Sequence, residues 1–246
     1  MRRTVIAGFV LLALVGGVSV RALTVDELVA KHVEARGGAA RLRSVQSVRL
    51  TGKLVFTGQF GVELRFMELI KRPGQIRQEV SIQGLTAVQA WDGKDGWQIS
   101  PFQGRKDPER MSLDDAKDLV DIADLDGPLV DWQSKGMRVE YVGTEDVDGT
   151  DAHKLRVTQK NGDVQTIYLD PDYFLVIRIL YQRLVRGAQV ETETDYGNYE
   201  RVSGVLIPFS RASGPRGSAK NQKVIIERAE ANVPVDGALF AFPTAK

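Results

Sequence analysis

Cysteine is absent from the 246 residues of this chain. Without a thiol, the protein forms no disulfide bond, no thiolate zinc site and no cysteine nucleophile. It also has no cysteine on which an exported chain could carry a covalently attached lipid behind its leader. Any function of the chain therefore uses non-covalent binding, or chemistry in which thiols take no part.

Histidine is scarce as well, since only His32 and His153 occur. Few Ser-His-Asp arrangements are therefore available, and the sequence has no G-x-S-x-G nucleophile elbow. A phosphate loop, a dinucleotide fingerprint and a zinc-binding helix are also missing. The paired acids of "EDVD" and "DLDG" lie in turn-like contexts, where aspartate is common for backbone reasons. We predict structural roles for both histidines, no catalytic residues, no cofactor and no metal.

Long apolar runs are confined to the N-terminus. Residues 1–22, "MRRTVIAGFVLLALVGGVSVRA", begin with two arginines, continue with an apolar run and end in small residues. This pattern predicts a cleaved secretory signal peptide and export to the periplasm. The alternative is an uncleaved membrane anchor, but the run is short for a span of roughly 20 residues and is interrupted by glycine.

Basic and acidic residues are nearly equal in number. Removing residues 1–22 changes the balance from 33 basic and 32 acidic residues to 30 and 32, a net charge of about −2. Such a chain does not have the basic character of a nucleic-acid-binding protein. The remaining residues, 23–246, contain no second apolar run and no low-complexity linker, so we expect a single domain.

The periodicity of apolar residues predicts a mainly β protein. Thr24 and Glu27 form a capping box before a short amphipathic helix that ends at Gly37. From residue 46 onward the period is two, which predicts long antiparallel strands over residues 46–83. Further strands are expected around 138–145, 153–160, 163–169, 174–184, 189–199, 205–212 and 222–232. In total we expect about 11–12 strands and two helices.

The segment "WDGKDGW" at residues 91–97 joins two strand-like stretches. Asp-Gly pairs supply turn residues that tolerate positive φ, so the segment predicts a hairpin tip at which Trp91 and Trp97 face each other. A calcium loop is the alternative, but Asp92 and Asp95 are too few ligands for one.

The β pattern is interrupted at residues 112–133. Ser112 and Asp115 are suited to cap a helix over 112–124, and Gly127 follows that helix as a potential hinge. We predict that this helix and the residues after it form a lid over the sheet. A permanently docked helix is the alternative. The apolar residues assigned to the lid are Leu113, Ala116, Val120, Ala123, Leu129 and Trp132.

Several of these stretches together resemble a known family. They are "VDELVAKHVEARGGAARLRSVQSVRLTGKL", "AWDGKDGWQISPFQG", "DLDGPLVDW", "YLDPDYFLVIR" and "YERVSGVLIPF". In this order they resemble the bacterial outer-membrane lipoprotein-sorting proteins of the LolA and LolB type. The resemblance extends over nearly all of residues 23–246. The absence of cysteine makes the chain similar to the soluble carrier rather than to the lipid-anchored receptor.

The resemblance implies a curved, half-open antiparallel β-barrel whose apolar concave face is covered by helices and carries lipoprotein acyl chains across the periplasm. It also implies a monomer that meets transport partners at the inner and outer membranes. A closed core that binds nothing is the alternative for the apolar face. The residues expected to line a ligand cavity are Leu50, Leu54, Phe56, Leu64, Phe66, Val80, Ile82 and Trp91.

Two other functions remain open at the level of sequence. The first is a regulatory or scaffold domain that senses lipids or envelope proteins and signals to a partner. The second is a hydrolase that uses an acidic pair outside the known motifs. A partner-binding domain would favour the first, and turnover of an ester or glycoside would favour the second.

Overall fold

The computed structural model describes residues 23–58 and 61–243, so the predicted signal peptide at 1–22 lies outside the described residues. Most of the described chain is β structure. The strands are β1 (Ser47–Phe56), β2 (Val62–Lys71), β3 (Gln75–Ile82), β4 (Leu85–Trp91), β5 (Gly96–Ser100), β6 (Arg105–Arg110), β7 (Arg138–Val147), β8 (Thr150–Thr158), β9 (Val164–Leu169), β10 (Val176–Val185), β11 (Ala188–Val202), β12 (Val205–Pro215) and β13 (Gln222–Ala231).

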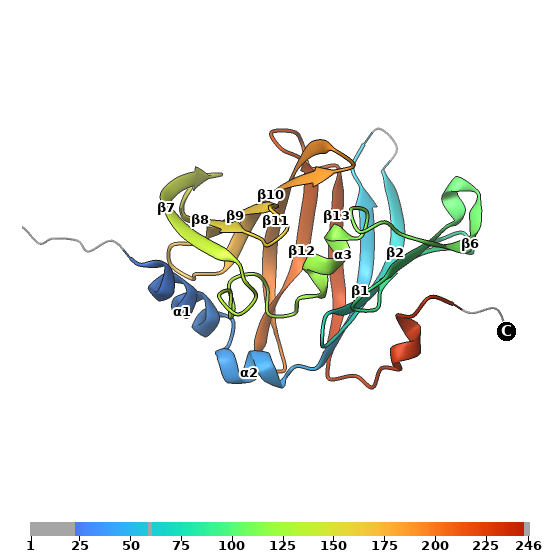
Figure 1. Cartoon of the computed structure of the whole chain (residues 1–246), viewed down its shortest axis with the longest axis horizontal. Coiled ribbons are helices and arrows are strands. Elements are labelled where there is room, and N and C mark those ends of the chain that lie inside the picture. Colours follow the sequence, from blue (N-terminus) through green and yellow to red (C-terminus); the bar gives the residue numbers. More distant parts are fainter. Residues whose placement is uncertain (1–22, 59–60, 244–246) are drawn as a thin grey trace, which may run out of the picture.

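These strands form one antiparallel sheet with the order β6-β5-β4-β3-β2-β1-β13-β12-β11-β10-β9-β8-β7. The sheet curves strongly and leaves β6 and β7 as its two edges (Figure 1). The prediction of a half-open antiparallel barrel is therefore confirmed, with 13 strands in place of 11–12. Alternation did not indicate β6, because its sequence "RKDPER" is charged and contains Pro108. An edge strand tolerates such a proline.

The centre of the sheet is bent where β1 pairs with β13. The register between the two strands shifts at Thr51 and Gly52, which marks a β-bulge. A Cβ atom on Gly52 would lie 2.0 Å from the carbonyl oxygen of Ile225. Only glycine allows the two backbones to approach this closely, so Gly52 contributes to the curvature of the sheet.

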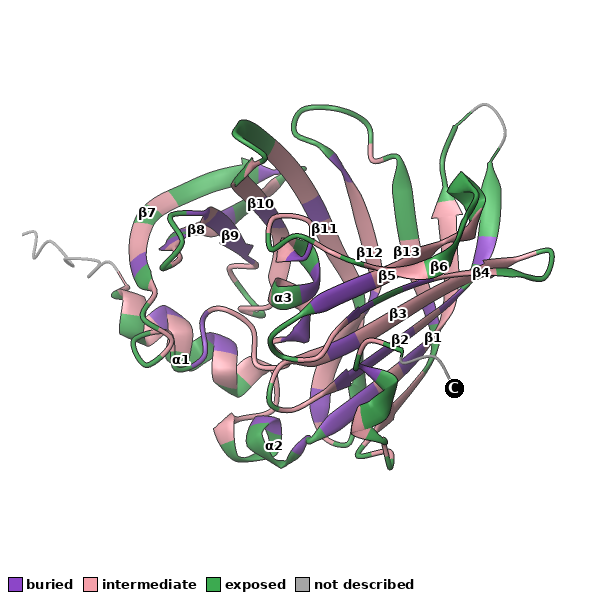
Figure 2. Ribbon diagram, turned by 45° about the vertical axis from the view of Figure 1, so that its right-hand side comes forward, coloured by how far each residue is buried: buried purple, intermediate pink, exposed green. Residues whose placement is uncertain are grey.

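Within the described residues, three α-helices and two short 3₁₀ helices accompany the sheet. The predicted capping box at α1 is confirmed, since the Glu27 amide donates to Thr24 Oγ1 at 3.2 Å and the Thr24 amide donates to the Glu27 carboxylate at 2.8 Å. Figure 2 shows α3 inside the curve of the sheet. The helices are α1 (Val25–Ala35), α2 (Ala39–Ser44), α3 (Lys117–Ala123), η1 (Pro101–Gln103) and η2 (Gly237–Leu239).

The helix predicted at residues 112–124 is shorter than expected. Ser112 and Asp115 do form the predicted hydrogen bond, but in a turn that precedes the helix. Because α3 begins only at Lys117, the residues on its inward face are not all those of the predicted apolar stripe. Ala116, Leu119 and Ala123 face the protein interior, whereas Leu113 is 72% exposed and Val120 is 43% exposed. The buried face of this segment therefore contains Leu119 instead of Leu113 and Val120.

The segment "WDGKDGW" is a hairpin tip, as predicted. The carboxylate of Asp92 accepts from the amides of Lys94 and Asp95, both at 2.8 Å. The Asp92 amide in turn donates to the Asp95 carbonyl oxygen at 3.1 Å. The side chain of Asp92 is thus used to stabilise the turn between β4 and β5.

The two tryptophans of this hairpin do not face each other, which corrects the sequence-based prediction. Trp97 pairs with Ala90, while Trp91 pairs with Gly96. Successive residues of a strand point to opposite faces, so the two indoles lie on opposite sides of the sheet. Trp91 packs near α3, and Trp97 donates from Nε1 to the carbonyl oxygen of Phe240 at 2.8 Å.

Candidate functional site

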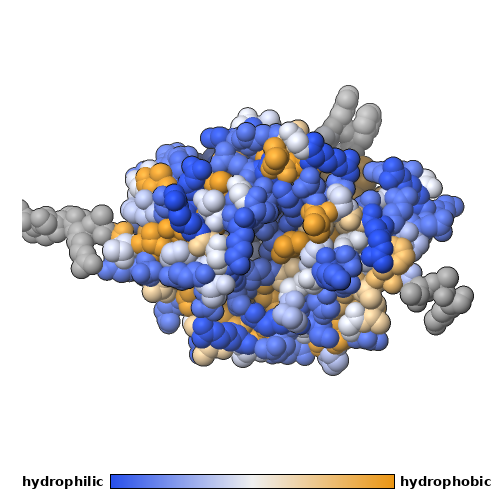
Figure 3. Space-filling view, in the orientation of Figure 1, coloured by the Kyte–Doolittle hydropathy of each residue, from blue (hydrophilic) through white to orange (hydrophobic). Residues whose placement is uncertain are grey.

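Two adjoining cavities lie on the concave side of the sheet. The inner cavity has a volume of about 210 Å³ and the outer cavity a volume of about 550 Å³. Five residues line both cavities, so the two spaces share a boundary. The space-filling view of Figure 3 shows a mostly hydrophilic face with a hollow near its centre. The shared residues are Asp121, Ile122, Tyr181, Tyr196 and Arg211.

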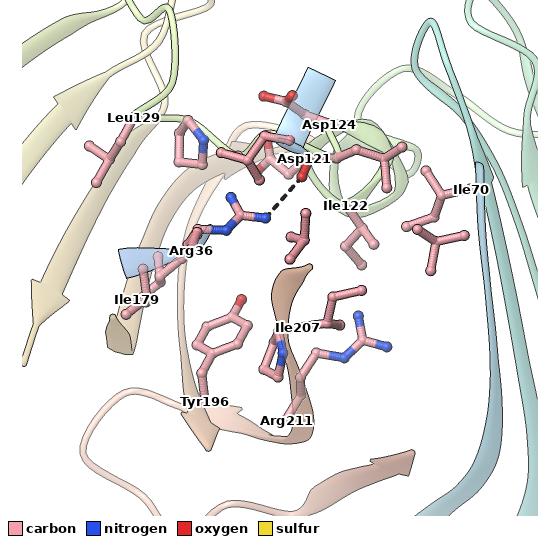
Figure 4. A pocket seen from close by; sticks show the side chains of 18 of the residues that line it. Arg36, Ile70, Asp121, Ile122, Asp124, Leu129, Ile179, Tyr196, Ile207 and Arg211 are labelled. Carbon is pink, nitrogen blue, oxygen red and sulfur yellow. Dashed lines mark hydrogen bonds between the residues drawn. The ribbon is translucent and has the colours of Figure 1, made fainter. Parts of the chain in front are cut away.

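The inner cavity is mainly apolar and receives side chains from both halves of the sheet. One wall comes from β1 and β2, and the facing wall comes from β9, β10, β11 and β12 (Figure 4). The segment after α3 completes the enclosure. The apolar residues that line the inner cavity are Leu42, Val45, Val48, Leu50, Ile70, Ile122, Leu125, Leu129, Ile167, Val176, Ile179, Val205 and Ile207.

Residues 121–129, which we call the roof, cover one side of the inner cavity. Two arginines hold the middle of the roof. Arg36, at the end of α1, donates to the carbonyl oxygens of Leu125, at 3.1 Å, and Asp126. Arg72 forms a bidentate ion pair with the Asp126 carboxylate, with both contacts at 2.6 Å. Charge-assisted bidentate pairs are among the stronger hydrogen bonds in proteins, so the roof is firmly attached to α1 and to the sheet.

The roof is also tied to the other half of the sheet through Asp121. Its carboxylate accepts from Gln159 at 2.9 Å and from Gln165 at 3.0 Å, and it contacts Arg183. Burial raises the pKa of Asp121 to about 6, and the two glutamine hydrogen bonds limit the rise. α3 is therefore attached to the turn after β8, to β9 and to β10 through a carboxyl group whose pKa is raised to about 6.

An ion pair lies at the boundary of the two cavities. Glu68 on β2 is fully buried, and its Oε2 accepts from Arg211 on β12 at 3.1 Å and from Gln78 at 2.7 Å. Burial alone would lower the pKa of Arg211, but the carboxylate of Glu68 reverses the effect and the pKa is raised. Arg211 therefore stays positively charged beside the carboxyl group of Glu68.

Two tyrosines complete this boundary. The hydroxyls of Tyr181 and Tyr196 lie 2.9 Å apart and share a hydrogen bond. Burial raises the pKa of both hydroxyls, so both remain protonated at neutral pH. The boundary thus combines one ion pair with one pair of neutral hydroxyls inside an otherwise apolar surface.

His32 forms part of the inner wall. Its Nδ1 donates to the carbonyl oxygen of Phe174 at 2.8 Å, and its side chain is buried. Burial lowers the pKa of His32 to about 4, and the nearby charge of Arg36 adds to the effect. The imidazole is therefore neutral at physiological pH and holds α1 against the β9–β10 connection. This is a structural contact of the kind predicted for it.

The structure places most of the predicted cavity residues around the two cavities. Leu50 lines the inner cavity. Leu64 and Ile82 share the concave face by register but lie outside both linings, and Trp91 packs under α3. The remaining four line the outer cavity and are Leu54, Phe56, Phe66 and Val80.

Among the six residues predicted for a lid, Leu129 lines the inner cavity as part of the roof. Ala116 and Ala123 are buried, and Trp132 packs against the cluster that contains Leu28 of α1. Ile122 and Leu125, which were not predicted, are the other aliphatic residues of the roof that line the inner cavity, and Pro128 lines it as well.

The boundary residues were not predicted from the sequence, although one of them leaves a signal there. Glu68 falls at a position of β2 where the alternation of Leu64, Phe66 and Ile70 calls for an apolar residue. A charged residue in such a register suggests a buried polar partner. Arg211 is that partner, but nothing in the sequence relates two positions that lie 143 residues apart.

Two further observations concern the described part of the chain. Within residues 23–58 and 61–243, no helix has both the length and the apolar character that crossing a membrane requires. In the same residues no three His, Asp or Glu side chains gather in a way that could hold a metal ion.

Comparison with known proteins identifies the fold. Neither a family model nor a curated protein matches the chain. The structure is similar to an outer membrane lipoprotein-sorting protein domain from Vibrio parahaemolyticus, with a TM-score of 0.60, 14% identity, and coverage of 88% of this chain and 95% of that chain. It is also similar to a LolA superfamily protein from Nitrosomonas europaea, with a TM-score of 0.59, 15% identity, and coverage of 89% and 98%.

A third solved structure supports the same conclusion. It is a DUF1329 family protein from Desulfovibrio piger, with a TM-score of 0.59, 15% identity, and coverage of 89% of this chain and 97% of that chain. Identities this low establish the fold alone. The protein therefore has the fold of the LolA-like lipoprotein-sorting proteins, as its sequence motifs indicated.

Proposed function

We propose that this protein is a periplasmic carrier that binds the acyl chains of a lipid or lipoprotein and transports them toward the outer membrane. It is exported by its signal peptide, works as a monomer, and exchanges cargo with partners at the inner and outer membranes. The observation that carries the proposal is the inner cavity, an apolar space enclosed by both halves of the sheet and the roof. The shared fold with proteins named for lipoprotein sorting supports it.

Burial of a hydrocarbon chain supplies enough free energy for such binding. Each buried methylene contributes about 0.8 kcal/mol, so a chain of roughly 14 methylenes gains on the order of 11 kcal/mol before ordering costs are subtracted. No ionic anchor is needed for affinity. Aliphatic side chains such as Ile179 and Ile207, which line the inner cavity, provide suitable contacts.

The size of the inner cavity indicates that cargo and roof compete for space. Its volume of about 210 Å³ lies below the range of roughly 300–1,000 Å³ that is typical of ligand pockets. A long chain therefore needs the outer cavity as well, or an outward movement of the roof. We propose that the roof acts as a lid, with Leu125 and Leu129 occupying apolar area that an acyl chain covers in the loaded protein.

A pair of variants on β12 tests the proposal. Ile207→Trp fills the inner cavity, whereas Leu206→Trp places the same side chain on the neighbouring residue, which lines neither cavity. We expect Ile207→Trp to weaken binding of a fluorescent apolar dye at least tenfold and Leu206→Trp to leave it unchanged. Dye titration against the folded variants measures both. Equal affinities in both variants would contradict binding in the inner cavity.

We also propose that the protein acts without catalysis. The acids that line the boundary of the cavities are engaged in structural contacts, Glu68 with Arg211 and Asp121 with Gln159 and Gln165. Incubation with nitrophenyl esters of different chain lengths is the direct test. We expect a protein-dependent rate no higher than that of a Glu68→Gln variant, and a rate that is lost in this variant would favour a hydrolase instead.

A further inference from the structure

The carboxylate of Glu68 is only partly satisfied by the protein. Its Oε2 accepts from Gln78 and Arg211, as described above. Its Oε1 lies 3.1 Å from Arg211 Nη2, but no donor of the described residues meets it in hydrogen-bonding geometry. In the described part of the chain, Gln165 Oε1 is the other buried side-chain acceptor in this condition. Glu68 lines the inner cavity, whereas Gln165 lines neither cavity.

An unsatisfied acceptor of this kind is costly and calls for an explanation. Buried polar groups in folded proteins almost always have partners, and an ionised carboxylate has about four acceptor sites. The cost is tolerated where a ligand supplies the missing donor. Since Glu68 lines the inner cavity and its partner Arg211 lines both cavities, a chain that extends from one cavity into the other passes this carboxylate.

The tyrosine pair provides the complementary group at the same boundary. Tyr181 and Tyr196 share one hydrogen bond between two hydroxyls, which uses one of their two protons. No acceptor of residues 23–58 or 61–243 takes the second proton, and both tyrosines line both cavities. The boundary therefore offers one open acceptor, Glu68 Oε1, and one open donor in the tyrosine pair.

We propose that this boundary selects lipids whose acyl chain is joined to its head by an uncharged group that carries a hydrogen-bond donor, an amide or a hydroxyl. The donor of the ligand binds Glu68 Oε1, and its carbonyl or hydroxyl oxygen accepts from the tyrosine pair. The chain occupies the inner cavity and the head lies in the outer cavity. This inference rests on the proposed carrier function and adds the class of cargo.

The same arrangement rejects a free carboxylate. The charge of Arg211 is already neutralised by Glu68, so the carboxylate of a fatty acid would enter as an unpaired negative charge beside a second one. A buried unpaired charge is strongly unfavourable. An ester with no donor avoids the repulsion but leaves Glu68 Oε1 without a partner. The expected order of affinity is amide and alcohol first, ester next and carboxylate last.

Four probes with the same chain length test this order. They are dodecanamide, dodecanol, methyl dodecanoate and dodecanoate, each used at pH 8 to displace an apolar dye from the folded protein. We expect the amide and the alcohol to bind about tenfold more tightly than the methyl ester, which corresponds to about 1.4 kcal/mol, and the carboxylate to bind most weakly. Equal binding of the four probes would overturn the selectivity while leaving the carrier function intact.

A double variant and its control assign the selectivity to the ion pair. Glu68→Leu combined with Arg211→Leu removes both charges together, since apolar replacement of a whole buried pair is tolerated far better than loss of one partner. We expect this variant to bind the methyl ester as tightly as the amide. The control is Glu79→Gln, which alters an ion pair with Arg77 outside both cavities and should keep the original order.

The remaining outcomes are equally decisive. If the double variant still prefers the amide, Glu68 does not recognise the donor and the inference is wrong. If none of the four probes displaces the dye from the unaltered protein, both the carrier function and the selectivity fail together. A preference for dodecanoate over the amide would show that Arg211 binds anions, which also overturns the inference.

Discussion

The inner and outer cavities differ in the lining that each would offer to an acyl chain. The inner cavity is the smaller, but its lining is mainly aliphatic, and one side is covered by a roof held by Arg36 and Arg72. The outer cavity is more than twice as large, and polar groups make up a larger share of its lining. The comparison teaches that volume alone does not select the candidate acyl site, because the apolar share of the lining decides how much hydrophobic affinity a cavity can offer.

The strongest test of this difference is to truncate two leucines of the same strand, one in the wall of each cavity, and to compare the losses of stability. Leu50→Ala enlarges the inner cavity at a buried site, where we expect a loss of about 3 kcal/mol in the free energy of unfolding. Leu54→Ala affects the outer cavity, where water reaches the new space, and we expect a loss of about 1 kcal/mol. Chemical denaturation measures both values, and equal losses would show that the two cavities are alike.

Loosening the roof should have the next largest effect on the free energy of unfolding. Arg72→Met leaves the partly buried Asp126 without its ion-pair partner, so we expect a loss of about 2 kcal/mol in unfolding free energy and faster entry of dye into the inner cavity. Arg43→Met is the matched control, because the Arg43–Asp131 pair is exposed and should contribute about 0.5 kcal/mol or less. Dye entry that stays unchanged in Arg72→Met would mean that the roof does not control access.

The sequence predicts the fold well wherever local patterns decide it. Alternation over residues 46–83 places β1, β2 and β3, and the Asp92 turn follows from its own side-chain chemistry. The prediction fails where a shift of one or two residues matters. Trp91 and Trp97 were expected on one face, but the register puts them on opposite faces. The start of α3 at Lys117 likewise turns Val120 outward and Leu119 inward.

The site could be predicted only in part, and for a physical reason. Apolar residues such as Leu50 and Phe66 reach the cavities because alternation alone assigns their face. The polar boundary depends on contacts between distant strands, such as Glu68 with Arg211, and no local pattern encodes these. The roof contributes Ile122 and Leu125 through the position at which a short helix ends, which sequence patterns define poorly.

Titration of Asp121 in the roof makes the free energy of unfolding depend on pH. Because burial raises the pKa of Asp121 to about 6, the folded state binds a proton more tightly than the unfolded state does. The stabilising contribution of this group is therefore fully present below about pH 4 and is lost as the pH rises through about 6. We expect a loss of at most about 3 kcal/mol over this window, measured by unfolding at several pH values. In Asp121→Asn this slope should disappear, and a slope that persists would assign the titration to another group.

The most direct test of the central claim is the position of a bound acyl chain. A fatty amide with a photoreactive diazirine at the end of its chain is bound to the protein, irradiated, and located by mass spectrometry of the peptides. Binding in the inner cavity predicts labels on β10 and β12, near Ile179 and Ile207. Labels confined to the outer cavity near Phe102, or to the exposed Leu113, would contradict an acyl site beneath the roof.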